Sequence, residues 1–107
     1  MRNYREEFTQ LRNQLRQIAR KVTLKDQLTD VDHFENQFHI QLINIHDLKH
    51  SIRSHDLRAS AEKTGNNGQV SETTWAEHEQ LLDDYQRLGH MLQELKTGFR
   101  NFIARLN

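Results

Sequence analysis

The chain contains no cysteine and no proline, and only four of its 107 residues are glycine. Without cysteine, the protein has no disulfide framework, no thiol nucleophile and no cysteine-based metal site. Proline and glycine break helices and form tight turns, so a chain nearly free of them can build long, uninterrupted helices. These absences favour an all-α protein.

Long apolar segments are also absent. The hydrophobic share is 35% and the charged share 28%, which suits slender helices with much solvated surface better than a thick layered core. No run approaches the roughly 18 apolar residues of a membrane span. The first residues, MRNYREEFTQ, lack the apolar centre of a signal peptide. We therefore expect a soluble, cytoplasmic protein that forms a single domain over residues 1–107.

Charges of opposite sign balance over the whole chain, with 15 basic and 15 acidic side chains, but the basic ones gather at the start. Residues 1–25 hold seven Lys or Arg residues against two glutamates. Such a segment is one that can bind nucleic acid or an anionic surface. Because the total is neutral and aromatic residues do not interleave with these arginines, packing beside acidic helices of the same chain explains it better. We do not expect nucleic acid as a partner.

Apolar residues recur every seven positions in three stretches, which predicts three helices with coiled-coil packing. The third stretch is the most regular, with Tyr85, Leu92 and Phe99 spaced seven apart. The expected helices span, in order, residues 2–24, 30–63 and 74–106.

Capping residues and turn formers predict where these helices begin and end. The first break is expected over residues 25–30, where Thr29 or Asp30 can cap the second helix. The loop between the second and third helices is expected at residues 64–73, with the sequence TGNNGQVSET. The candidates for the cap of the third helix are Ser71, Thr73 and Thr74.

These three helices fit an antiparallel three-helix bundle, a helical hairpin with a shorter N-terminal helix beside it. The first helix is about 35 Å long and the other two about 50 Å, so the loop end of the hairpin has no third helix to cover it. An apolar end left uncovered predicts self-association as a homodimer or binding to another helical protein. The residues expected at this interface are Ile52, His55, Leu57, Trp75, His78 and Leu82.

Two polar residues occupy positions of the apolar seam in the second helix. They are Gln41 and His55. Polar groups at such positions reduce stability and tend to fix the register or the oligomeric state. Gln41 therefore joins the candidate interface residues.

Four of the seven histidines lie in residues 38–56. A helical projection places His39, His46 and His50 within about 40° of one another on a flank, away from the seam. His46 and His50 are one turn apart and could hold one metal ion. Asp47 points about 100° away from His46, so a third ligand would have to come from another helix or chain. Metal binding is thus an alternative, and no cofactor is expected.

The run His46-Asp47-Leu48-Lys49 resembles the short motif around the phosphoacceptor histidine in the dimerisation domain of sensor histidine kinases. The resemblance implies His46 as phosphoacceptor and Asp47 as its general-base neighbour, in a helical hairpin that dimerises. The sequence departs from the family pattern at His50, where Asn or Thr is usual, and at Ser51, where Pro is usual.

Other signs of catalysis are missing from the sequence. No serine lies in a strand-turn-helix elbow, and no glycine-rich phosphate loop precedes a helix. We therefore expect a non-enzymatic interaction or scaffold module that self-associates. The alternatives are a phosphorelay-type module acting through His46 and a metal binder using His46 and His50.

Overall fold

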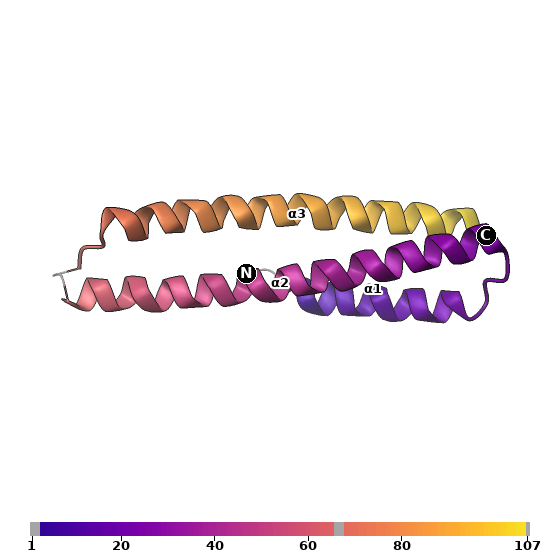
Figure 1. The fold of residues 1–107 in the computed structure, drawn as a ribbon, viewed down its shortest axis with the longest axis horizontal. Coiled ribbons are helices and arrows are strands. Elements are labelled where there is room, and N and C mark those ends of the chain that lie inside the picture. The colour runs from indigo at the N-terminus through magenta and orange to yellow at the C-terminus, as the bar shows by residue number, and fades with distance from the viewer. Residues whose placement is uncertain (1–2, 66–67, 107) are drawn as a thin grey trace.

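The computed structural model describes residues 3–65 and 68–106, which form three α-helices. They are α1 (Tyr4–Ala19), α2 (Lys25–Gly65) and α3 (Glu72–Leu106). Figure 1 shows α2 and α3 as a long antiparallel hairpin, with α1 folded back along the half that lies farthest from the α2–α3 connection. The predicted all-α fold is confirmed. The predicted helix start at residue 2 and positions 66–67 of the predicted loop lie outside the described residues.

A cluster of phenylalanines forms the core where the three helices meet. Phe38 of α2 is fully buried, and its ring meets Phe99 of α3 nearly at right angles, with 5.1 Å between centroids. Phe8 of α1 packs on Phe38 from the other side at 6.0 Å. Phe8, Phe38 and Phe99 belong to the seven-residue repeats of their helices, so the sequence pattern directly specifies this core.

The first break occurs earlier than the predicted residues 25–30. α1 ends at Ala19 and α2 begins at Lys25, so the connection occupies residues 20–24. Thr29, a predicted cap, lies inside α2, where its hydroxyl donates to the carbonyl of Lys25 at 3.1 Å. The adjacent β-branched residues Val22 and Thr23 lie in this connection, and their slightly lower helix propensity is compatible with a turn here.

The connection between α2 and α3 is closed by a hydrogen-bonded cluster. The Ser71 hydroxyl accepts the backbone N–H of Thr74 at 3.1 Å and so caps α3, which makes Ser71 the candidate that the structure selects. The carboxylate of Glu62 in α2 accepts the Ser71 N–H at 3.1 Å and the Thr74 hydroxyl at 2.7 Å. Gly68 adopts a left-handed φ of 86°, which glycine tolerates without strain.

The short length of α1 leaves part of the hairpin uncovered. At 1.5 Å per residue, α1 is about 24 Å long and α2 about 61 Å. Tyr4, the first residue of α1, lies level with Tyr85, whose ring centroid is 6.1 Å away. Beyond this level α2 and α3 are the only helices among residues 3–65 and 68–106, and we call α2 residues 49–65 with α3 residues 72–85 the two-helix end. None of the described helices combines the length and apolar character needed to cross a bilayer.

Candidate functional site

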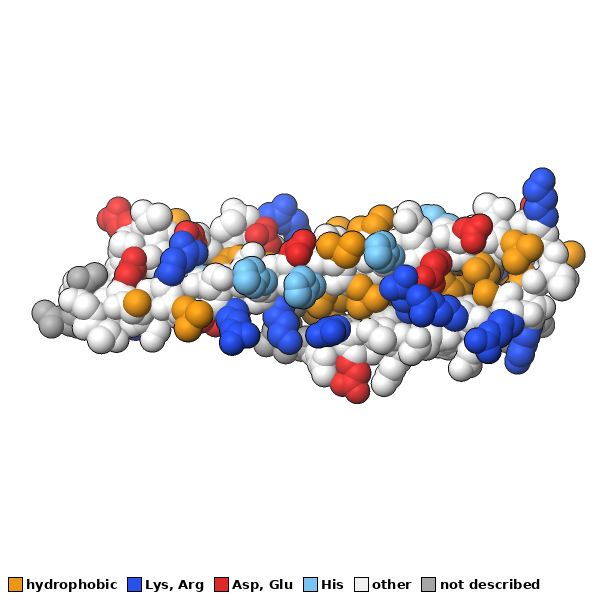
Figure 2. Space-filling model, turned by 60° about the horizontal axis from the view of Figure 1, so that its bottom comes forward, with side chains coloured by type: hydrophobic (Ala, Val, Ile, Leu, Met, Phe, Trp, Pro, Cys, Tyr) orange, Lys and Arg blue, Asp and Glu red, His pale blue; other side chains and the backbone are white. Residues whose placement is uncertain are grey.

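The histidines on the flank of α2 lie at the surface. His39, His46 and His50 are all exposed, and Figure 2 shows histidine side chains along this face with Lys and Arg side chains beside them. In the part of the chain that the structure describes, no three His, Asp or Glu side chains are grouped so that they could hold a metal ion. His46 and His50 alone therefore supply at most two ligands to an ion, and a third would have to come from a second molecule.

The structure also shows how accessible the kinase-like motif is. His46 and Asp47 are both exposed on α2, while Leu48 of the same run is half-buried against the core. An attacking imidazole must reach its phosphodonor, and this position allows it. Two open pockets between α2 and α3 flank this part of α2: Asn44 and Leu48 line one, and His50 lines the other.

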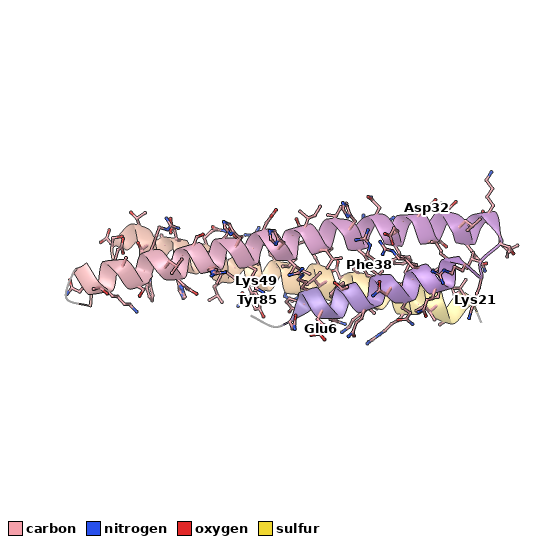
Figure 3. All side chains as sticks on the ribbon, turned by 90° about the horizontal axis from the view of Figure 1, so that it is seen from below. Glu6, Lys21, Asp32, Phe38, Lys49 and Tyr85 are labelled. Atoms are coloured by element: carbon pink, nitrogen blue, oxygen red, sulfur yellow. The ribbon has the colours of Figure 1, made fainter. Side chains whose placement is uncertain are left out.

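A groove of about 210 Å³ opens between α2 and α3 at the two-helix end. The groove begins level with the first residue of α1, since Tyr85 both lines the groove and contacts Tyr4. Figure 3 shows Tyr85 and Lys49 at this level, with the hairpin continuing past the start of α1. The groove is lined by Ile52, His55, Asp56, His78, Leu81, Leu82 and Tyr85.

Three large apolar side chains are strongly exposed at the two-helix end. The exposed fraction is 66% for Leu57, 58% for Trp75 and 52% for Leu82. In the three-helix half Leu15 and Leu92 are almost fully buried, while the large apolar side chains exposed there are less so, at 40% for Leu28, 39% for Ile40, 47% for Ile43 and 45% for Met91. The exposed side chains of the two-helix end were predicted from the length difference between the helices, because an α1 of 16 residues cannot reach them.

His55 is the anchor between the two helices of this end. Only 4% of its surface is exposed. Its ring lies 5.5 Å from that of His78, and its Nδ1 lies 3.4 Å from an oxygen of Glu77. Glu77 also forms an ion pair with Arg58 at 2.7 Å. The polar seam position predicted at His55 is therefore buried, and its partner comes from α3 of the same chain.

His78 differs from His55 although both are seam positions in the sequence. It is exposed, and its ring lies between those of His55 and Trp75, stacking on the latter at 5.8 Å with 26° between the planes. The rings of His55, His78 and Trp75 thus form a row from the buried interior to the surface. His78 stays exposed because the third helix that would cover a seam position does not extend this far.

Gln41 lies apart from the other predicted interface residues. It is in the three-helix half of α2, with 8% of its surface exposed, and its side-chain oxygen accepts a hydrogen bond from Asn44 at 3.3 Å. The structure thus places this polar residue within the core of one chain and not at the two-helix end.

Two acidic residues stabilise the two-helix end through contacts across the hairpin that the sequence pattern did not predict, although Glu77 also fits a capping box with Thr74 in the sequence. Glu77 bridges His55 and Arg58, and Glu62 holds Ser71 and Thr74. The hydrogen bond from the Thr74 hydroxyl, followed by that from the Ser71 N–H, keeps the pKa of Glu62 below its usual value. No local signal identifies these contacts, because the partners lie across the hairpin and are found only once the register of α2 on α3 is known.

The chain was also compared with known proteins. It matches no protein-family model, and neither the curated proteins nor the solved structures provide a match.

Proposed function

We propose that this protein is a non-enzymatic helical interaction module that self-associates through its two-helix end. The observation that supports this most directly is the exposure of Trp75 and Leu82 beside an apolar groove, at the place where the third helix stops. Contiguous apolar surface of this kind, framed by polar residues, is typical of protein interaction sites.

The energy available from this surface is sufficient only if several side chains are buried together. Full burial of one large apolar side chain is worth about 1.5–3 kcal/mol, whereas association costs about 4–15 kcal/mol in lost freedom of motion. One partly exposed Trp75 cannot offset that cost. A symmetric contact buries Trp75, Leu82 and the groove of both copies. This doubles the buried apolar area and the free energy gained from burying it, and so favours self-association.

Light scattering combined with size-exclusion chromatography tests this proposal. We expect the unmodified protein to have the mass of a dimer at micromolar concentration and Trp75→Ser combined with Leu82→Ser to have the mass of a monomer. Leu24→Ser is the matched control, since Leu24 is 62% exposed but lies in the α1–α2 connection at the opposite end. A monomeric unmodified protein, or dissociation caused equally by Leu24→Ser, would refute the proposal.

Phosphoacceptance at His46 is the second candidate function, and the exposure of His46 beside Asp47 favours it. Incubation with a labelled small-molecule phosphodonor tests it. If His46 is the acceptor, acid-labile label is incorporated by the unmodified protein and by His50→Ala, and is lost in His46→Ala. Absence of label in the unmodified protein would eliminate this candidate without affecting the first.

A further inference from the structure

We infer that the groove is filled by a second copy of the same two-helix end, turned end for end, so that two hairpins form an antiparallel four-helix bundle around a twofold axis beside His78. This inference rests on the proposed function and adds the identity of the partner, its direction and its register. It follows from the position of α1, the spacing of the exposed side chains, their charges and the size of the surface.

The position of α1 determines the direction in which the copies run. α1 lies on the groove side of the hairpin, since Tyr4 reaches Tyr85 of the groove lining. Two copies joined groove to groove and pointing the same way would press α1 against the partner's α1 and hold the two-helix ends apart. Copies pointing in opposite directions bring the two-helix ends together and place the two α1 helices at the far ends. All neighbouring helices are then antiparallel, which also opposes their dipoles favourably.

The spacing of Trp75 and Leu82 determines the register. They are seven residues apart and therefore lie on one stripe of α3. A twofold axis that runs α3 antiparallel to the partner's α3 places Trp75 on the partner's Leu82, and Leu82 on the partner's Trp75. Both contacts form when the axis passes midway between them, between His78 and Glu79. One stripe thus provides both halves of a self-complementary contact.

The charges of the two-helix end agree with this register. The α3 stripe that meets the partner consists of Trp75, His78, Leu82 and Tyr85, none of them an acid or a permanent cation. Asp56 is the acidic residue of the groove lining, and it is exposed on α2. The full chain carries as many acidic as basic side chains, so two copies approach without net repulsion.

The size of the surface is that of a modest dimer interface. The 17 residues of α2 in the two-helix end extend for about 25 Å, and two helices side by side are about 20 Å wide. The footprint is therefore roughly 500 Å² per copy, or about 1,000 Å² for the pair, which reaches the lower limit of specific interfaces. We accordingly place the dissociation constant in the micromolar range.

Introduced cysteines test the register directly, because the natural chain contains none. His78→Cys puts one thiol beside the axis in each copy, within the roughly 7 Å between Cα atoms that a disulfide requires. Ala76→Cys is the matched control, two residues away and exposed on another side of α3. At micromolar protein under mild oxidation, we expect His78→Cys to form disulfide-linked dimer roughly a hundred-fold faster than Ala76→Cys, since neighbouring thiols have effective concentrations in the millimolar range.

The outcomes separate this inference from the proposed function. If reduced His78→Cys has the mass of a dimer by light scattering but forms its disulfide no faster than Ala76→Cys, the register is refuted and self-association is not. A monomeric unmodified protein refutes both. If reduced His78→Cys is itself monomeric while the unmodified protein is a dimer, Glu79→Cys on the other side of the axis replaces it, and slow linking there refutes the register in the same way.

Discussion

The two glycines inside α3 differ in what surrounds them. A Cβ atom added at Gly98 would lie 3.8 Å from the ring of Phe34, an ordinary contact distance. At Gly89 the added atom would lie 3.2 Å from the hydroxyl oxygen of Tyr4, which is tighter than usual contacts. Gly98 therefore has room for a Cβ atom, whereas at Gly89 the side chain of Tyr4 from α1 lies close to the α3 backbone.

We expect Gly98→Ala to raise the free energy of unfolding by about 0.5–1 kcal/mol, because alanine restricts the unfolded chain and favours the helix. Gly89→Ala should raise it less, since the Tyr4 hydroxyl must move by a few tenths of an ångström. Urea denaturation followed by circular dichroism measures both values. A loss of stability in Gly98→Ala would show that the space beside Phe34 is smaller than the contact distance indicates.

The histidines show how far single residues could be predicted from the sequence. The seven-residue repeat correctly predicted that His55 is buried and that His39, His46 and His50 lie on a flank. It could not distinguish His55 from His78, because both are seam positions. Their difference depends on where α1 ends and on the pairing of His55 with Glu77 across the hairpin, and neither is a local property of the sequence.

At the scale of helices, α1 is held to α2 by one acidic residue between two basic ones. Glu35 of α2 accepts a hydrogen bond from Arg12 at 2.8 Å and forms an ion pair with Arg16 at 3.4 Å. Burial raises the pKa of Glu35, but the hydrogen bond and charge of Arg12, together with Arg16, lower it by more. The net result is a pKa below the usual value of 4.5.

A lowered pKa in the folded state gives stability that is present above the unfolded pKa and lost as pH falls through the folded one. We therefore expect the unfolding free energy of the unmodified protein to decrease below about pH 4.5. In Glu35→Gln this decrease should be smaller, because the variant has no carboxylate at the α1–α2 contact to protonate. Urea titrations at a series of pH values measure it, with the exposed Glu94→Gln as control. An unchanged pH profile in Glu35→Gln would contradict the assignment.

The start of α3 depends on one hydroxyl group. The Ser71 side chain accepts the Thr74 N–H, and Glu62 of α2 holds both residues. We expect Ser71→Ala to lower the unfolding free energy by about 1 kcal/mol, the usual effect of losing a helix cap. Thr73→Ala, which removes a hydroxyl two residues later, should cost much less. Thermal unfolding followed by circular dichroism compares them, and equal losses would show that Ser71 is not the cap.

The helices themselves could largely be predicted from the sequence, but not all their ends. The number of helices, their antiparallel order and the short first helix follow from the repeats and from the scarcity of glycine and proline. The second helix begins five residues before the predicted position, since no glycine or proline marks the break and the β-branched pair Val22 and Thr23 is a weak signal. The Ser71 cap was one of three equivalent candidates until the position of Glu62 was known.

At the scale of the whole molecule, the single tryptophan reports on assembly. Trp75 is 58% exposed in one chain and lies within the proposed contact between copies. We expect its fluorescence emission to shift to shorter wavelength as the protein concentration rises, with a midpoint on the order of 1 µM, equivalent to about 8 kcal/mol of association free energy. Leu82→Ser should move this midpoint to higher concentration. Emission that does not depend on concentration, together with a monomeric mass, would exclude burial of Trp75 between copies.

The rod shape of the single chain has a hydrodynamic consequence. The chain measures 63 × 18 × 17 Å and its radius of gyration is 18.8 Å, against about 13 Å for a compact domain of the same length. Its friction in water therefore exceeds that of a sphere of equal mass, and a monomer elutes from a gel-filtration column at the volume of a considerably heavier globular protein. In the proposed dimer, end-to-end overlap of two rods would lengthen the particle further, so that elution volume would overstate the mass of both species and the dimer would sediment slowly for its weight.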